Sequence, residues 1–133
     1  MSTAQALSMQ TPDAACDWQP VCSRQDLVAH SGVVAWLAGA QIALFFLPDG
    51  QGGGQVHAIH NRDPQSGANV IGRGLLGQLQ GALVVASPLY KQHFRLADGL
   101  CLEQPDVSLK VWPARLEGER VEILAPLSST ACN

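Results

Sequence analysis

The chain has 133 residues, of which 47% are hydrophobic and only 14% charged, and its formal net charge is −3. This length suits one domain with one core, so disorder of the whole chain is not expected. The acidic balance and the lack of a lysine and arginine cluster argue against nucleic acid as a partner. The longest apolar run, Ile42–Leu47, is strand-sized, and residues 1–15 lack signal-peptide features. We therefore expect a cytoplasmic protein without membrane contact.

Short β-rich runs closed by turn residues follow one another from Asp17 onward. No window of eleven or more residues keeps a helical period. The pattern predicts an all-β fold, a mostly antiparallel β-sandwich or small barrel over residues 17–124, between a disordered arm at 1–16 and a loose tail at 125–133. The predicted strands are Asp17–Cys22, Val33–Leu37, Ile42–Leu47, Val56–His60, Ala82–Ala86, Gln92–Leu96, Leu100–Leu102, an alternating run at 107–111, and Val121–Leu124.

Apolar positions within these strands supply the candidate core. Because side chains alternate along a strand, an error of one residue moves a whole set to the opposite face. The candidates are Trp18, Val34, Trp36, Leu44, Phe46, Val84, Leu109 and Val111.

Four cysteines occupy positions 16, 22, 101 and 132, and no two have the spacing of a zinc or iron–sulfur motif. Without a secretory signal, we expect free thiols in a reducing compartment. Cys22 and Cys101 lie among strand residues and are interpreted as small buried apolar groups.

Two patterns match functional motifs only in their letters. Gly72–Gly77 reads GxGxxG, but only Gln78–Gly81 separates it from the next predicted strand, which is too short for the helix of a dinucleotide site. His57 and His60 form HxxH, yet residues three apart on a strand point to opposite faces and cannot share a metal. Local motifs therefore identify no catalytic, cofactor-binding or metal-binding residue.

Two proline-containing loops each come directly after a predicted strand. The first spans Asn61–Ala68 and the second Ser87–Phe94. Taken alone, Asp63-Pro64 and Ser87-Pro88 are ordinary turn signals.

The two loops and their strands resemble the Rieske ferredoxin domain. The similar segments are A-I-H-N-R-D-P-Q-S-G-A and V-V-A-S-P-L-Y-K-Q-H-F-R-L-A-D-G. In that family a Cys-x-His loop and a Cys-Pro-x-His loop hold a [2Fe–2S] cluster. The resemblance puts Asp63 and Ser87 at the cysteine positions, and Gln65 and Tyr90 at the histidine positions. None replaces a thiolate or an imidazole, so the resemblance implies a Rieske scaffold without the cluster and no metal or cofactor in this chain.

Further segments are similar to one group of this family, the small subunits of assimilatory NAD(P)H-dependent nitrite reductase. They are W-x-x-V-C-S-R-x-D-L (Trp18–Leu27), Q-I-A-L-F (Gln41–Phe45), R-G-L-x-G (Arg73–Gly77), G-L-C-L-E (Gly99–Glu103) and P-D-V-S-L-K-V-W (Pro105–Trp112). The resemblance implies an accessory subunit of a complex that reduces nitrite to ammonium with electrons from NAD(P)H. The large partner subunit is then expected to carry FAD, a [4Fe–4S] cluster and sirohaem.

Two other functions remain open. An electron-transfer ferredoxin would need the missing thiolates. A free-standing enzyme or ligand-binding β-barrel would need a convergent polar cluster, which the sequence does not offer.

In the resembled family the loop tips face the electron-transfer partner, so we expect the two loops side by side at one end of the domain. Pro88, Leu89, Tyr90 and Lys91 are candidates for a partner interface, with Asp63 as an opposite charge nearby. In the alternative interpretation, Tyr90 fills the volume that the cluster and its histidine would occupy.

Overall fold

The computed structural model describes residues 16–37, 39–89 and 92–126. These residues form strands and short 3-10 turns without an α-helix, which confirms the all-β prediction. None of the described elements is a helix that could cross a membrane. The strands are β2 (Cys16–Ser23), β3 (Gly32–Leu37), β4 (Ala40–Pro48), β5 (Gly54–His60), β6 (Leu75–Leu79), β7 (Ala82–Ala86), β8 (His93–Arg95), β9 (Val111–Trp112), β10 (Ala114–Glu117) and β11 (Arg120–Pro126), and the 3-10 turns are η3 (Arg24–Asp26) and η4 (Ile71–Arg73).

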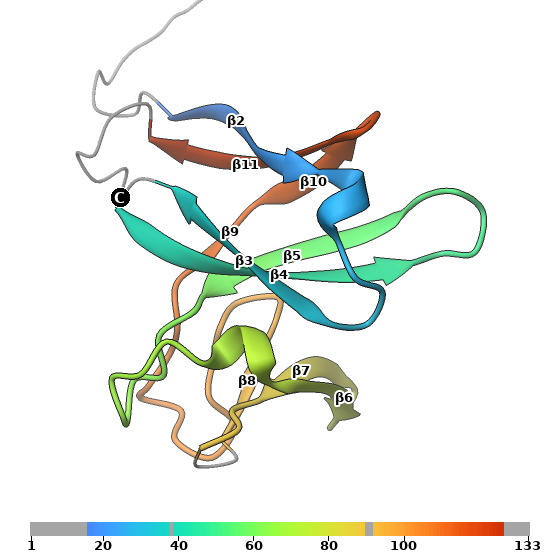
Figure 1. Ribbon diagram of the computed structural model, residues 1–133. Helices are drawn as coiled ribbons and strands as arrows, with labels where there is room; N and C mark the ends of the chain where they lie inside the picture. The colour runs from blue at the N-terminus through green and yellow to red at the C-terminus, as the bar shows by residue number, and fades with distance from the viewer. Residues whose placement is uncertain (1–15, 38, 90–91, 127–133) are drawn as a thin grey trace, which may run out of the picture.

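Three antiparallel sheets form successive layers (Figure 1). The upper sheet has the order β10-β11-β2, the middle sheet β3-β4-β5-β9, and the lower sheet β6-β7-β8. Strand β4 is apolar on both faces because the middle sheet is covered from above and below. Ile42, Leu44 and Phe46 face one side, and Ala43 and Phe45 face the other. This double burial explains the continuous apolar run in the sequence.

The upper core lies between the upper and middle sheets. Strand β11 contributes Val121, Ile123 and Ala125 to this core at alternating positions. Between them, Glu122 lies on the opposite face and makes ion pairs with Arg115 (2.8 Å) and Arg120 (3.0 Å). Long ladders between β11 and β2, and between β4 and β5, connect the strands around this core.

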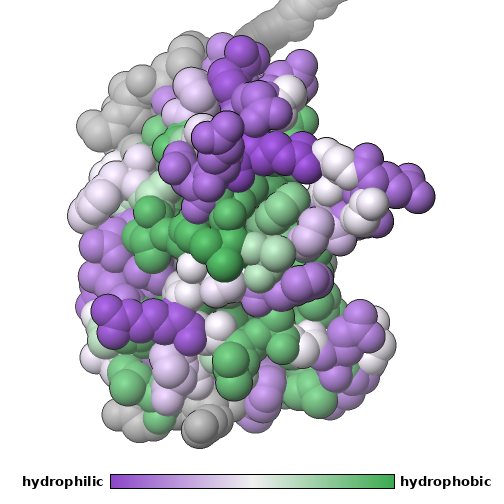
Figure 2. Space-filling view, turned by 45° about the vertical axis from the view of Figure 1, so that its right-hand side comes forward, coloured by the Kyte–Doolittle hydropathy of each residue, from purple (hydrophilic) through white to green (hydrophobic). Residues whose placement is uncertain are grey.

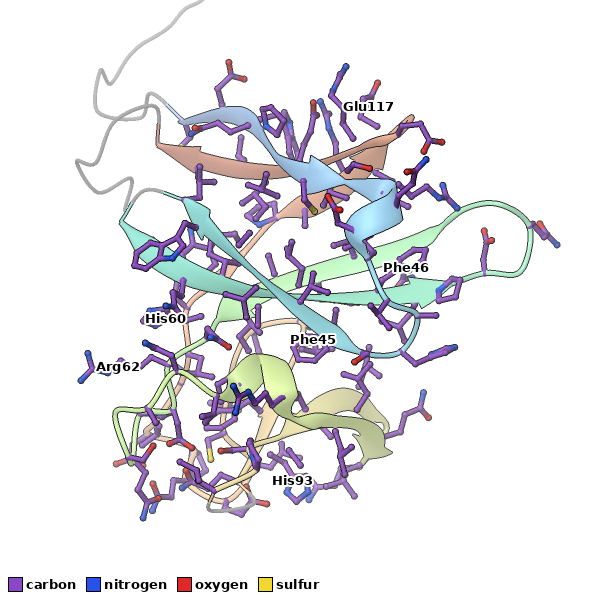
Figure 3. The ribbon with its side chains drawn as sticks, in the orientation of Figure 1. Phe45, Phe46, His60, Arg62, His93 and Glu117 are labelled. Atoms are coloured by element: carbon purple, nitrogen blue, oxygen red, sulfur yellow. The ribbon has the colours of Figure 1, made fainter. Side chains whose placement is uncertain are left out.

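The lower core lies between the middle and lower sheets. Phe45 and Ile59 reach it from the middle sheet, and in Figure 3 Phe45 points down toward the lower layer. The remaining buried members come from η4, the lower sheet and the segments that follow it; they are Ile71, Val85, Phe94, Leu96, Cys101 and Leu109.

The predicted strands correspond to observed ones, with four differences. Strand β10 was not predicted. Strand β6 was not predicted, and its LLGQL sequence carries a glycine that weakens a strand signal. The predicted strand Leu100–Leu102 makes only isolated bridges. The alternating run at 107–111 forms regular pairing only in β9.

The predicted register of β3 is wrong by one residue. Val34 and Trp36, both core candidates, are 50% and 66% exposed. Val33, Ala35 and Leu37 pack against the upper core instead. Of the other candidates, Leu44, Phe46, Val84 and Leu109 are buried, whereas Trp18 and Val111 are half-buried.

The expectation of four free thiols is wrong for Cys16, which is disulfide-bonded. Cys22 and Cys101 are free, with Cys101 buried and Cys22 half-buried. Cys16 pairs with Pro126 at the edge of the upper sheet, so β2 begins opposite the end of β11. The spacing of cysteines in the sequence cannot predict that these two ends of the chain meet in the fold. The predicted arm and tail are each too long at their inner ends, because Cys16 belongs to β2, and Ala125 and Pro126 belong to β11. Residues 1–15 and 127–133 lie outside the described residues.

Two of the three glycines of the GxGxxG segment serve packing. Gly72 lies in η4, which contacts the middle sheet, and Gly74 lies between η4 and β6. A Cβ on Gly72 would lie 3.0 Å from Val34 Cγ2, and one on Gly74 would lie 2.4 Å from the carbonyl oxygen of Ala86. Glycine therefore permits close approach of backbone segments here, as expected for a connection rather than a nucleotide loop.

Candidate functional site

The two proline loops meet at the lower end of the domain. The first follows β5 and the second follows β7, so neighbouring layers bring them together. Ser87 Oγ donates a hydrogen bond to Asp63 Oδ2, and both residues are fully buried. The loops therefore lie side by side, as predicted.

Asp63 organises the first loop. Its Oδ1 accepts hydrogen bonds from the backbone N–H groups of Gln65 (2.8 Å) and Ser66 (3.2 Å). The Asp63 amide donates to the carbonyl of Ala68, and its own carbonyl accepts from Gly67, both at 2.8 Å. The two bonds to Oδ1 and the bond from Ser87 to Oδ2 compensate for burying a carboxylate, which is costly without donors around it.

Ser87 has the corresponding place in the second loop. Its amide donates to the carbonyl of Gln92 at 2.8 Å, so the two ends of the loop are tied together. Pro88 and Leu89 are exposed beyond Ser87, with Leu89 at 49%. The predicted site residues Tyr90 and Lys91 lie outside the described residues.

Asn61 fixes the entry to the first loop and was not identified from the sequence. It is 2% exposed, its Nδ2 donates to Gln41 Oε1 at 3.0 Å, and its Oδ1 accepts from the amide of Gly72 at 2.6 Å. Asn61 thus connects β4, the first loop and η4. The available signal was a polar residue directly after an apolar strand.

The described residues at the ligand positions do not fit a [2Fe–2S] cluster. The resemblance places Asp63 and Ser87 at the two cysteine positions, and in the structure their side chains bond to each other. A carboxylate, a hydroxyl and the Gln65 amide are hard oxygen and nitrogen donors, whereas the cluster takes thiolates and imidazoles. Across the described ranges no group of three His, Cys, Asp or Glu residues is placed to hold a metal ion.

The histidines lie apart from one another. His57 stands opposite Phe45, which faces the lower core, and His60 stands opposite Ile42, which faces the upper core. The HxxH pair therefore points to opposite faces, as predicted. Loss of hydration on burial lowers the pKa of His57 and of His60 below the usual imidazole value.

A surface pair flanks the second loop. His93 Nδ1 lies 2.6 Å from Glu103 Oε2, and the His93 amide donates to Glu103 Oε1 at 2.8 Å. Partial burial tends to raise the pKa of Glu103, but the hydrogen bonds from His93 outweigh it and hold this pKa below the usual carboxyl value. The pair holds the chain around Glu103 against the start of β8.

Two cavities lie among the described residues. The larger, of about 360 Å³, is lined by Val56, His57, Ala58, Leu96, Ala97, Val111, Trp112, Pro113 and Ala114. His57 is the one titratable group in that lining, so no set of polar groups converges there. The smaller, of about 130 Å³, lies beside the loops and is lined by Pro64, Gln65, Gln92, Gln104 and Val107.

Comparisons with known proteins agree on the family. The model of the Rieske-like [2Fe-2S] domain matches residues 17–124. The nitrite reductase (NADH) small subunit of Salmonella typhimurium is 44% identical over 108 residues, which make up 80% of this chain and 95% of that protein. The NMR structure of the Escherichia coli protein NirD matches with a TM-score of 0.72 and 40% identity, covering 82% of this chain and 96% of that one.

A third relative has a different length. A Klebsiella oxytoca protein named nitrite reductase [NAD(P)H] large subunit is 40% identical over 104 residues, which are 78% of this chain but only 10% of that protein. A domain of this kind thus occurs both as a short chain and inside a much longer one. By the extent and identity of these matches, the chain belongs to the Rieske-like [2Fe-2S] domain family and, within it, to the nitrite reductase small subunits.

Proposed function

We propose that this protein is the non-catalytic small subunit of an assimilatory NAD(P)H-dependent nitrite reductase in the cytoplasm. The observation that carries the proposal is the buried hydrogen bond between Ser87 and Asp63. The resemblance places these residues at the two positions where a Rieske domain holds one iron. The hydrogen bond favours a domain that keeps the Rieske architecture while redox chemistry takes place elsewhere. The names of the relatives support the same function.

The redox centres belong, in this proposal, to the large subunit. That subunit would carry FAD, a [4Fe–4S] cluster and sirohaem, and would reduce nitrite to ammonium. The Klebsiella oxytoca relative supports the pairing, because a domain like this one forms part of a protein named as a large subunit. This chain would add a rigid accessory domain to the catalytic one.

The alternatives have less support. An electron-transfer ferredoxin requires soft ligands, whereas Asp63, Gln65 and Ser87 offer oxygen and amide groups. A free-standing enzyme or binding module requires polar groups around a cavity, whereas the lining of the larger cavity is mostly apolar.

The tip of the second loop remains a proposed contact with the large subunit. Pro88 and Leu89 are exposed and available for it, and Tyr90 and Lys91 follow them in the sequence. Asp63 no longer belongs to this surface, because it is fully buried and bonded to Ser87. The variants Leu89→Ser and Lys91→Glu should weaken association without lowering the melting temperature.

Co-expression with the large subunit tests the function. We expect the two chains to purify together, and NAD(P)H-dependent nitrite reduction to fall when this chain is omitted. We expect the isolated chain to contain no stoichiometric iron or acid-labile sulfide. One cluster per chain, or a large subunit whose yield and activity do not depend on this chain, would contradict the proposal.

A further inference from the structure

Large apolar side chains are exposed on two strands that border the middle and lower layers. On β3 they are Val34 (50%) and Trp36 (66%), and on β6 they are Leu75 (78%) and Leu79 (39%). We call these four residues the β3–β6 face. Figure 2 shows apolar surface in the centre of one face of the molecule and again below it.

The backbone explains why Val34 and Trp36 are exposed. They lie opposite Ala43 and Gln41, so they point to the side of the middle sheet that holds the lower core. Strand β3 is the end strand of its sheet, and neither Val34 nor Trp36 belongs to the lower core. Trp36 is thereby exposed even though a side chain of this kind is usually buried on at least one side.

The same situation occurs on β6. Leu76 packs against the lower core, so its neighbours Leu75 and Gly77 point away from that core. Strand β6 is the end strand of the lower sheet. Turn η4 joins the two parts of the face, because it packs against β3 and leads through Gly74 directly into Leu75. Arg73 on η4 is also exposed and adds a charged group next to the β3–β6 face.

We propose that the β3–β6 face is the principal docking surface for the catalytic large subunit. This inference rests on the proposed function and adds the surface through which it operates. An exposed tryptophan with an arginine nearby is typical of an interface centre, and the leucines and Val34 add exposed apolar surface, which is typical of an interaction site. A partner that covers this face would also protect two end strands, which otherwise offer free backbone groups to other chains.

The large subunit is the occupant that the relatives indicate. A domain 40% identical to this chain forms part of a much longer chain named as that subunit, where the two are permanently attached. Where the domain is a separate chain, it must bind the large subunit through non-covalent contacts on its surface. An apolar surface of this kind supplies the required affinity.

The test measures binding of the purified large subunit to the full chain and its variants by biolayer interferometry. The variants Trp36→Ser and Leu75→Ser remove apolar groups from the face. Glu117→Gln is the control, because this exposed residue lies on β10 of the upper sheet, outside the β3–β6 face, and stands at the top of the molecule in Figure 3. Melting temperatures of all variants are compared with that of the parent protein, and they should agree because the changed side chains are exposed.

We expect Trp36→Ser to weaken binding at least about tenfold, Leu75→Ser to weaken it less, and Glu117→Gln to leave it unchanged. Parent-like binding by both face variants would overturn the docking surface while leaving the proposed function in place. No binding by the parent protein would overturn the proposed function itself. If the parent chain alone dimerises and Trp36→Ser is monomeric, the face serves self-association and the proposal is wrong.

Discussion

The upper core and the lower end of the domain share the middle sheet, but different interactions hold them together. The upper core is enclosed by long strand ladders and apolar side chains. The lower end has short strands and isolated bridges. It also holds four of the five buried polar side chains found among the described residues, namely Asn61, Asp63, Ser87 and Gln92. A buried hydrogen bond between Ser87 and Asp63 joins the two proline loops there.

Two core substitutions test whether these regions fold as one unit. Leu44→Ala removes a buried side chain from the upper core, and Phe94→Ala removes one from the lower core. We expect losses of about 2–5 and 3–5 kcal/mol in the free energy of unfolding, because each leaves a cavity. Because β4 contributes to both cores, urea denaturation should still show a single transition. A second transition in Phe94→Ala would mean that the lower end unfolds separately.

Substitution of Asp63 tests the polar connection. Asp63→Ala removes the acceptor for two backbone amides and the Ser87 hydroxyl, so about 1–3 kcal/mol of stability should be lost. Asp63→Asn keeps one carbonyl oxygen for the amides and should cost less. Ser87→Ala removes the bond to Asp63 and the long one, of 3.5 Å, from the Leu89 amide. A double-mutant cycle between Asp63→Ala and Ser87→Ala should give a clear coupling energy in thermal denaturation, and strictly additive effects would show that the two side chains act independently.

The GxGxxG segment offers a matched pair of glycine substitutions. A Cβ at position 74 would meet the backbone oxygen of Ala86, so Gly74→Ala should destabilise the domain by about 1–3 kcal/mol. A Cβ at position 77 would meet nothing within 4 Å, so Gly77→Ala should be neutral or slightly stabilising. The melting temperatures of Gly74→Ala and Gly77→Ala, compared with that of the parent protein, test this difference. Equal losses at both positions would contradict the packing role of Gly74.

The same contrast explains what the sequence could predict. Strands of the upper core were found because β11 alternates apolar and polar residues along Val121–Leu124. The register of β3 was missed because every residue from Val33 to Leu37 is apolar, so alternation does not define which face is inside. Apolar content alone locates a strand but does not orient it.

At the candidate site, the resemblance located both loops, and the residues alone gave only two turns. The burial of Asp63 was missed because its bonding partner Ser87 is 24 positions away in the sequence, on a loop from a different layer. Asn61 was missed for the same reason, since its contacts lie on β4 and η4. Contacts of this kind depend on tertiary structure and leave no local pattern.

The smallest expected effect concerns the two histidines that face opposite cores. Burial lowers the pKa of His57 and of His60 from the ordinary value of 6.5, and the charges of Arg62 and Lys110 contribute to the second shift. The unfolded chain then binds more protons than the folded one near that value. Stability should therefore be highest above pH 6.5, fall as the pH drops through 6.5 toward the folded pKa values, and level off below them.

Salt separates the two causes. Added salt screens Arg62 and Lys110 but does not restore the water lost on burial. In NMR titrations, the pKa of His60 should rise with salt concentration and that of His57 should stay nearly constant. In the paired variants, His57→Gln and His60→Gln should each reduce the slope of stability against pH between pH 5 and 7, as expected for titration near the imidazole pKa. Equal salt responses of the two imidazoles would show that the charges of Arg62 and Lys110 do not influence the pKa of His60. Burial alone would then lower the pKa of both histidines.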